Sequence, residues 1–173
     1  NNKKLLYQLS FPEKETWLFS DTNVIKVVDG KLKSRETINS ILDLTIYYLV
    51  LDGNLINYGL SSSWFTVKDV EKDDSLVITT YDINNPKLKG YEIAVATQNK
   101  KLYGVAYMGK EGQLMSQKFF EDYITINGLQ FPKKVTQIFY KDGKESYEID
   151  KYDNIILNEQ GNDEMYNYTP PSE

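Results

Sequence analysis

The side chains of this chain that could carry out acid and base chemistry are carboxylates. The sequence contains neither Cys nor His, so thiolate nucleophiles, imidazole bases, Ser-His pairs and zinc-finger ligands are excluded by residue type. In a strand, neighbouring side chains point to opposite faces, whereas a glycosidase needs two carboxyl groups facing each other across a cleft. The acids that are adjacent in sequence are Asp73-Asp74, Glu121-Asp122 and Asp163-Glu164. We therefore expect no enzymatic activity.

Clusters of oxygen ligands could in principle hold calcium. Asp150 and Asp153 lie close together in sequence, and Asn162, Asp163 and Glu164 are consecutive. Neither spacing matches an EF-hand loop, so both groups are interpreted as ordinary surface turns. We expect no metal site and no cofactor.

The charge balance argues against nucleic acid as a partner. The chain has 20 Lys and Arg residues against 25 Asp and Glu residues, with a net charge of -5 at pH 7. Such a chain has no general attraction to phosphate backbones. Its longest apolar stretch, 46–51, is far shorter than the roughly 20 residues that cross a bilayer as a helix. We expect a chain that does not span the membrane.

Turn signals divide most of the chain into short strands. Asp-Gly and Asn-Gly pairs, as at 29–30, 127–128 and 142–143, favour two-residue hairpin loops. The runs between the turns are rich in Val, Ile, Thr, Tyr and Phe. They predict strands at 17–20, 24–28, 64–70, 76–81, 91–97, 102–108, 118–126, 134–140, 146–152 and 155–157. Because parallel pairing would need helical crossovers, we predict a large antiparallel meander.

One segment departs from this pattern. Residues 40–43 resemble a capping box before the apolar run 44–51, and Asp52-Gly53 would end the element. We predict a helix over 37–51, which makes the chain mainly β with some α (α+β). A buried strand is the alternative, because the same run is rich in residues that favour strands.

Aromatic residues are numerous, with 14 Tyr, 7 Phe and 2 Trp making up 13% of the chain. Most are interpreted as sheet formers and core fillers. Seven large side chains would nevertheless provide more apolar lining than one short helix can cover, if they share one face of a curved sheet. These are Trp17, Phe19, Trp64, Tyr91, Ile93, Tyr103 and Tyr107. Such a surplus predicts a cavity or a groove.

Several short motifs carry a resemblance to a known family. They are Val27-Val-Asp-Gly30 after the aromatic Trp17-Leu-Phe19, then Ile126-Asn-Gly128, Phe131-Pro-Lys-Lys134, Tyr147-Glu-Ile149 and the terminal Tyr168-Thr-Pro170. Together they resemble the periplasmic outer-membrane lipoprotein carrier superfamily, the LolA/LolB-like proteins. The similarity runs over most of the chain.

The resemblance implies a strongly curved antiparallel sheet forming an incomplete barrel, with a helix packed on the concave side and a hydrophobic cavity between them. The helix over 37–51 would take the place of a lid, which adds Ile41, Leu44 and Tyr48 to the expected cavity lining. We expect a single LolA-like domain over 1–173. The family usually opens with an amphipathic helix, whereas this chain begins almost at once in 5–9. Either an N-terminal helix and signal segment are lacking, or the lid is reduced.

The function implied by the resemblance is non-enzymatic binding of a lipid acyl chain or an acylated lipoprotein, as in carriers that sort outer-membrane lipoproteins. The implied location is the periplasm, with a lipid anchor to the outer membrane through a removed N-terminal segment. An envelope protein would be a further partner. The alternative is an interaction or sensor domain on the same fold, with a protein as its ligand. A carboxylate hydrolase would instead require two acids that converge in a cleft.

Overall fold

The structure is a computed structural model of the chain. It describes residues 5–9, 13–19, 23–37, 57–60, 63–153, 155 and 168–171. The chain divides into two compact units, one formed by Asn1–Tyr48 with Asn158–Glu173 and the other by Leu49–Leu157. The expectation of a single domain over 1–173 stays a prediction.

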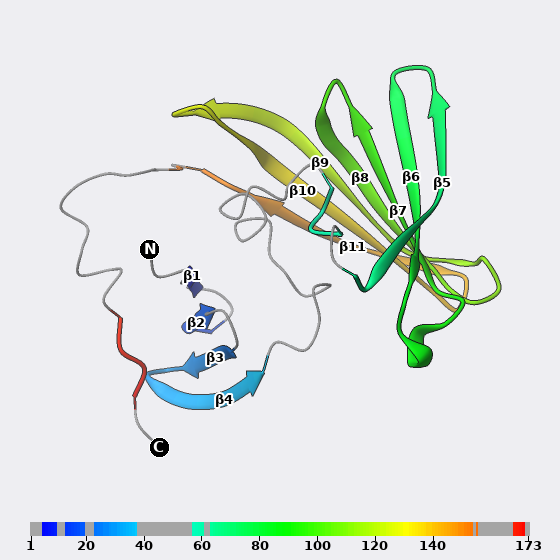
Figure 1. Cartoon of the computed structure of the whole chain (residues 1–173). Coiled ribbons are helices and arrows are strands. Elements are labelled where there is room, and N and C mark those ends of the chain that lie inside the picture. The colour runs from blue at the N-terminus through cyan, green and yellow to red at the C-terminus, as the bar shows by residue number, and fades with distance from the viewer. Residues whose placement is uncertain are drawn as a thin grey trace. The chain divides into compact units, whose positions relative to one another are not determined.

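The first unit contains a small antiparallel sheet, shown in blue in Figure 1. Its strands follow one another in the order β1 (Leu5–Leu9), β2 (Glu15–Phe19), β3 (Asn23–Val28) and β4 (Lys31–Thr37). The strands predicted over 17–20 and 24–28 are confirmed as β2 and β3. Leu18 and Val27 lie on one face of this sheet and are 8% and 3% exposed, so that face is the buried one.

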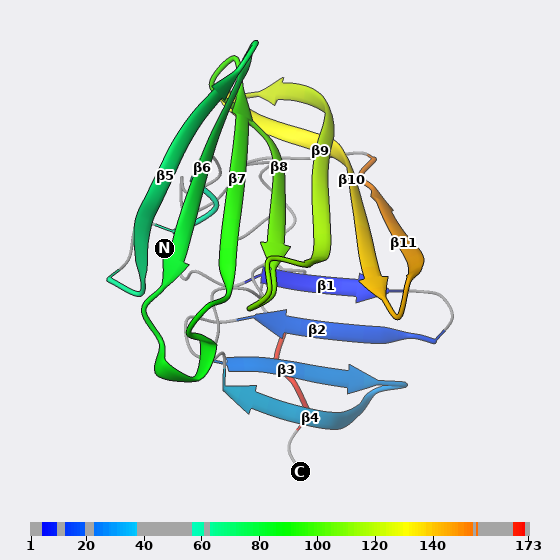
Figure 2. The same cartoon turned by 90° about the vertical axis from the view of Figure 1, so that its right-hand side faces the viewer.

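The second unit contains a larger sheet, whose strands also follow one another in sequence order (Figure 2). All neighbouring strands are antiparallel, as predicted, but the single large meander that was expected is divided between two sheets. Its strands are β5 (Phe65–Asp73), β6 (Leu76–Ile83), β7 (Glu92–Gln98), β8 (Lys101–Met108), β9 (Leu114–Ile126), β10 (Leu129–Lys141) and β11 (Lys144–Lys151). Within the described residues β5 and β11 do not pair with each other, so this large sheet is open rather than a closed barrel.

The tight turns have the backbone that their sequence predicts. Asn127 and Gly128 have φ angles of 49° and 82°, and Asp142 and Gly143 have 52° and 72°. These left-handed conformations match the twist of the flanking strands, and they suit Asn, Asp and Gly. Local turn chemistry therefore sets the hairpins that join β9, β10 and β11.

The predicted helix over 37–51 falls mainly outside the described residues. Thr37 is the last residue of β4, so the helix cannot begin there, and its remainder, like the helix on the concave side, stays a prediction. The helical element in the described part of the chain is η2, a short 3-10 helix over Pro86–Leu88 between β6 and β7. In the same described part, no helix is long and apolar enough to cross a bilayer.

The long hairpin of β9 and β10 bends along its length (Figure 2). Asp122, in the middle of β9, has a φ of 54°. The register pairs Tyr123 with Pro132 and Glu121 with Lys134, and leaves no assigned pair at Asp122 between them. Proline cannot donate to a ladder, and one left-handed residue turns a strand. The bend of this hairpin is therefore associated with the left-handed residue and the interrupted pairing at Asp122.

The core of the large sheet lies on one of its faces. Paired residues of neighbouring strands share a face, as do residues two apart along a strand. The pairs Val95–Val105 and Phe120–Val135 follow this rule. We call this the inner face. Its buried core, 0–6% exposed, consists of Ile93, Val95, Leu102, Val105, Phe120 and Val135.

Tyr58 and Leu60, each 2% exposed, belong to the same unit and lie in the chain before β5. The rings of Tyr58 and Phe120 are 6.1 Å apart between centroids. The Tyr58 hydroxyl also accepts a hydrogen bond of 3.4 Å from Lys118 Nζ. The chain segment 57–60 thus covers part of the inner face near β9.

Replacing Ile93 with Ala tests whether the inner face is the core. Ile93 is fully buried, so Ile93→Ala should lower the free energy of unfolding by about 3 kcal/mol, through lost apolar burial and the cavity it leaves. Val70→Ala, at a site 58% exposed, should cost only about 0.5 kcal/mol. Urea unfolding followed by circular dichroism measures both, and equal losses would contradict this assignment.

Candidate functional site

Apolar residues of the inner face continue beyond its buried part, onto strands where they are exposed to water. Across the sheet, Val95 pairs with Thr79, and Thr79 pairs with Val70. Exposure rises along this row from 2% at Val95 to 58% at Val70. The row therefore runs from the packed core to apolar side chains in contact with water.

A second row runs in parallel with the first. Ile93 pairs with Tyr81, and Tyr81 pairs with Val67. Ile93 is fully buried, whereas Val67 is 53% exposed. Val77 on β6, paired with the inner-face position Thr97, is 38% exposed. We call Val67, Val70 and Val77 the open end of the inner face.

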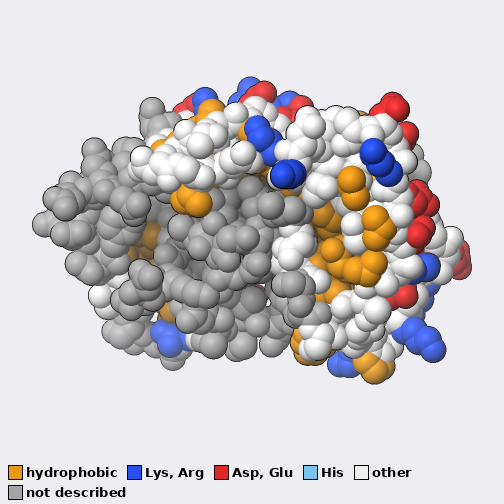
Figure 3. Space-filling view, turned by 45° about the horizontal axis from the view of Figure 1, so that its top comes forward, with side chains coloured by type: hydrophobic (Ala, Val, Ile, Leu, Met, Phe, Trp, Pro, Cys, Tyr) orange, Lys and Arg blue, Asp and Glu red, His pale blue; other side chains and the backbone are white. Residues whose placement is uncertain are grey.

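An apolar surface of this kind can bind an apolar ligand. Burying apolar area is favourable by about 25 cal/mol per Å², and contiguous exposed apolar patches on soluble domains commonly mark interaction sites. Figure 3 shows hydrophobic side chains gathered on one part of the surface, with acidic and basic side chains around them. The open end has no side chain placed for covalent chemistry, because it consists of valines.

Two tyrosines give the inner face a polar component. Tyr81 lies between Ile93 and Val67 in its row, and burial raises the pKa of its hydroxyl. Tyr107 pairs with Ile93 on the other side and is partly buried. Both side chains therefore bring phenol groups next to the apolar positions of the inner face.

Lys118 and Asp150 place charges directly beside core positions of the inner face. Lys118 pairs with Val105 and Asp150 pairs with Val135, both core positions. Partial desolvation raises the pKa of the Asp150 carboxyl, although its side chain is exposed, and the positive charge of Lys118 acts in the opposite direction. Next to its core, the inner face thus carries a cation held near Tyr58 and a carboxylate that its surroundings disfavour in the charged form.

Tyr103 lies on the other face of the sheet from Ile93, contrary to the prediction that the two share a face. Between β7 and β8, Ala96 pairs with Gly104 but Thr97 pairs with Leu102, so Tyr103 is an extra residue in a bulge. Its ring makes an edge contact with Phe119, with 6.0 Å between centroids. Leu102, 1% exposed, takes the inner position that was assigned to Tyr103.

A hydrogen bond satisfies a backbone carbonyl next to this bulge. The Tyr123 hydroxyl donates to the Leu102 carbonyl oxygen at 2.7 Å. Burial raises the pKa of Tyr123, so the hydroxyl stays protonated and able to donate. Lys101 Nζ lies 5.4 Å from the centroid of the same ring.

The outer face is the side of the large sheet opposite the inner face, and its apolar members are Tyr103, Phe119, Ile138, Tyr147 and Ile149. Its central polar group is Glu121, which accepts hydrogen bonds from Lys134 Nζ at 2.8 Å and from Thr136 Oγ1 at 3.1 Å. The hydrogen bond from Lys134 holds the pKa of Glu121 below its usual value. Glu121 is thus an ionised surface group, bonded to its neighbours in the sheet.

Of the described residues, none forms a group of three or more acids that could hold a metal ion. Asp150 and Asp153, considered as calcium ligands, lie at the end of β11, where Asp153 pairs with Lys133 at 3.6 Å. The candidates Asn162, Asp163 and Glu164 fall outside the described part of the chain.

Of the other predicted lining residues, two belong to the first unit and three lie outside the described residues. Trp17 belongs to the first unit, where its indole Nε1 donates to Glu15 at 2.6 Å and Lys26 Nζ lies 4.7 Å from the ring centroid. Phe19 lies at the end of the same strand, β2. Ile41, Leu44 and Tyr48 lie outside the described residues.

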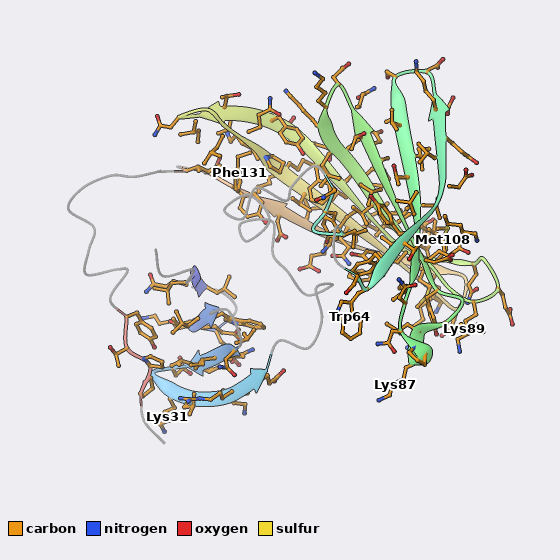
Figure 4. All side chains as sticks on the ribbon, in the orientation of Figure 1. Lys31, Trp64, Lys87, Lys89, Met108 and Phe131 are labelled. Atoms are coloured by element: carbon orange, nitrogen blue, oxygen red, sulfur yellow. The ribbon has the colours of Figure 1, made fainter. Side chains whose placement is uncertain are left out.

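The remaining predicted residues belong to the second unit. Trp64 precedes β5 and is 55% exposed (Figure 4). Tyr91 precedes β7, and Lys110 Nζ lies 5.6 Å from its ring centroid. Ile93 and Tyr107 form one cross-strand pair of the inner face, so these are the two lining residues that the structure brings together there.

Sequence reasoning missed the open end and most of the core. Val67 and Val70 lie in a predicted strand, but they were not assigned to the lining because valine is an ordinary strand residue. Phe131, buried on β10 (Figure 4), packs its ring against Tyr152 at 5.5 Å between centroids. Side chains two residues apart in a strand share a face. Counting in steps of two from Ile93 would have placed Val95 on the inner face.

Comparison with known proteins concerns the fold. No protein-family model matches the chain, and no curated protein matches it by sequence. Among solved structures, the chain is similar to the crystal structure of a LolA superfamily protein from Nitrosomonas europaea, with a TM-score of 0.51 and 12% identity. The match covers 84% of this chain and 67% of that chain. The fold is LolA-like. At this identity the likeness extends to the fold alone, which agrees with the resemblance found in the turn and strand motifs.

Removing the inner-face carboxylate should stabilise the protein at neutral pH. Since partial desolvation raises the pKa of Asp150, the folded state binds the carboxyl proton more tightly than the unfolded state. Stability therefore falls as the pH rises through the interval above the usual Asp pKa. Asp150→Asn should therefore raise the melting temperature at pH 7 and leave it nearly unchanged near pH 3.

Asp142→Asn is the matched control, because it removes the same charge at an exposed hairpin turn where Asn suits the left-handed backbone. Thermal melts of the three proteins across this pH range measure the effect. A stabilisation by Asp150→Asn that is as large at pH 3 as at pH 7 would show that ionisation is not its cause.

Proposed function

We propose that the chain binds an apolar ligand, a lipid acyl chain or an acylated lipoprotein, on the inner face of its large sheet. The observation that carries the proposal is that two rows of the inner face, which pass through Thr79 and Tyr81, lead from full burial at Ile93 to valines more than half exposed at positions 67 and 70. A ligand seated on the open end would extend the existing core instead of creating a new contact surface.

The energetics suit reversible binding. Each buried CH₂ of an acyl chain contributes about 0.8 kcal/mol, so about six methylene groups lying over the open end would gain about 5 kcal/mol before the cost of immobilising the chain. A ligand held only on one side keeps part of its surface in water. Such a site can release its cargo to a second apolar environment, which a carrier requires.

The LolA-like fold supports the same proposal. The solved neighbour is described as a LolA superfamily protein, and the sequence motifs resemble the lipoprotein carriers of that superfamily. Binding and release need no covalent step, in keeping with a chain that lacks Cys and His. These features support the proposal of a non-enzymatic carrier that acts in the periplasm.

A protein-binding function on the same fold is the second candidate. It is favoured by the exposed apolar side chains of the outer face, of which Tyr147 is 60% and Ile149 54% exposed. In that case the inner face would be a structural core, and the ligand would be a partner protein in the cell envelope. Uptake of a lipid probe distinguishes the two functions.

Titration with a fluorescent fatty acid tests the lipid-binding proposal. The wild-type chain should bind the probe, and Val67→Gln/Val70→Gln should weaken binding about tenfold, because two apolar contacts are replaced by polar ones. Both sites are more than half exposed, so the variant should fold normally by circular dichroism.

Met115→Gln is the control, since Met115 on β9 is comparably exposed at 42% but lies outside the open end. Its affinity for the probe should equal that of the wild type. If the wild-type chain neither takes up the probe nor co-purifies with lipid, the lipid-binding function is ruled out and the protein-binding function is favoured.

A further inference from the structure

Strand β11 forms one border of the large sheet in the described part of the chain (Figure 2). All of its side chains are exposed. An edge strand presents a row of unpaired backbone N–H and C=O groups, which can pair with another strand. The sequence of β11 therefore decides which partner can be added.

The backbone groups that face outward belong to every second residue. The Tyr152 N–H donates to the Lys133 carbonyl at 2.8 Å, so position 152 directs its backbone groups toward β10. By alternation along an antiparallel ladder, the same holds at positions 150, 148, 146 and 144. The groups that face away from β10 belong to Glu145, Tyr147, Ile149 and Lys151.

These outward-facing positions are complementary to themselves. In antiparallel pairing with a second copy of β11, a register that places Tyr147 opposite Ile149 also places Glu145 opposite Lys151. If the second copy slides so that Tyr147 lies opposite Tyr147, Glu145 lies opposite Ile149. The opposite shift puts Ile149 opposite Ile149 and Tyr147 opposite Lys151. Of these three registers, only the first matches the two apolar residues with each other and the two charged residues with each other at the four outward-facing positions.

We propose that the chain forms a two-fold symmetric dimer by antiparallel pairing of β11 with β11 of a second copy, with the axis at Glu148. The four outward-facing residues of each copy would exchange about eight backbone hydrogen bonds. Tyr147 would lie beside Ile149 of the second copy, and Glu145 beside its Lys151. The two large sheets would then be continuous. This inference is independent of the proposed lipid binding.

Two further features bear on the strength of the dimer. The Tyr147 hydroxyl donates to the Glu145 carboxylate within the same strand, which orders both side chains on the outer face before pairing. Against this, Glu148 meets Glu148 of the second copy at the axis, and like charges directly opposite each other destabilise a sheet. Charges on an edge commonly prevent indiscriminate pairing, and here they select one register of a weak dimer.

A charge exchange in the full-length chain tests the register. Glu145→Lys should place two lysines together at both ends of the contact and raise the dimer dissociation constant about tenfold, and Lys151→Glu should do the same with two glutamates. The double variant Glu145→Lys/Lys151→Glu restores opposite charges, so its dissociation constant should return to within about threefold of the wild-type value. Sedimentation equilibrium at low salt measures all four proteins.

The substitution Glu148→Gln should strengthen the dimer instead of weakening it. It removes the repulsion at the axis and should lower the dissociation constant about threefold or more. Glu71→Lys on β5, the strand at the other border of the large sheet, should leave the constant unchanged. The proposal is overturned if the wild type and Glu148→Gln both stay monomeric up to about 0.5 mM, or if the double variant is as weak as the single ones. Probe titration reports separately on lipid binding.

Discussion

The large sheet depends on removing one of its faces from water. Hairpins joined by tight turns have little stability by themselves, so Ile93, Val95 and Val105 on neighbouring strands must pack together, and Phe120 must pack against Tyr58. The opposite face can remain polar, because Lys134 and Thr136 satisfy Glu121 there. The proposed ligand site follows from the same requirement, since the apolar rows that form the core extend beyond its covered part.

Local sequence signals explain most of the fold. Asn127-Gly128 and Asp142-Gly143 adopt the left-handed turns that their residue types favour, and the strands between such turns were predictable from composition. Strand β4, with the sequence KLKSRET, was missed because its charged residues give no apolar alternation. It pairs with β3 through the Asp29-Gly30 turn, so chain connectivity rather than composition determines its structure.

The site was only partly predictable. Ile93 and Tyr107 share the inner face as expected, because alternation is reliable along an undisturbed strand. Tyr103 was misplaced because a bulge depends on the neighbouring strands, and no residue type in the sequence marks it. Trp17 was grouped with these residues by its type alone, although it belongs to a different compact unit. The open valines were overlooked because their importance lies in exposure, which a sequence does not show.

Because of the bulge at Tyr103, strand β8 can lose one residue at this position without disturbing the core. Leu102 and Gly104 face opposite sides of the sheet even though one residue separates them. Deleting Tyr103 would leave a regular strand in which every remaining side chain keeps its side, whereas a deletion between Gly104 and Met108 would turn one part of the strand over. Tyr103 is therefore the position in β8 where evolution can gain or lose a residue without exchanging the core for the surface.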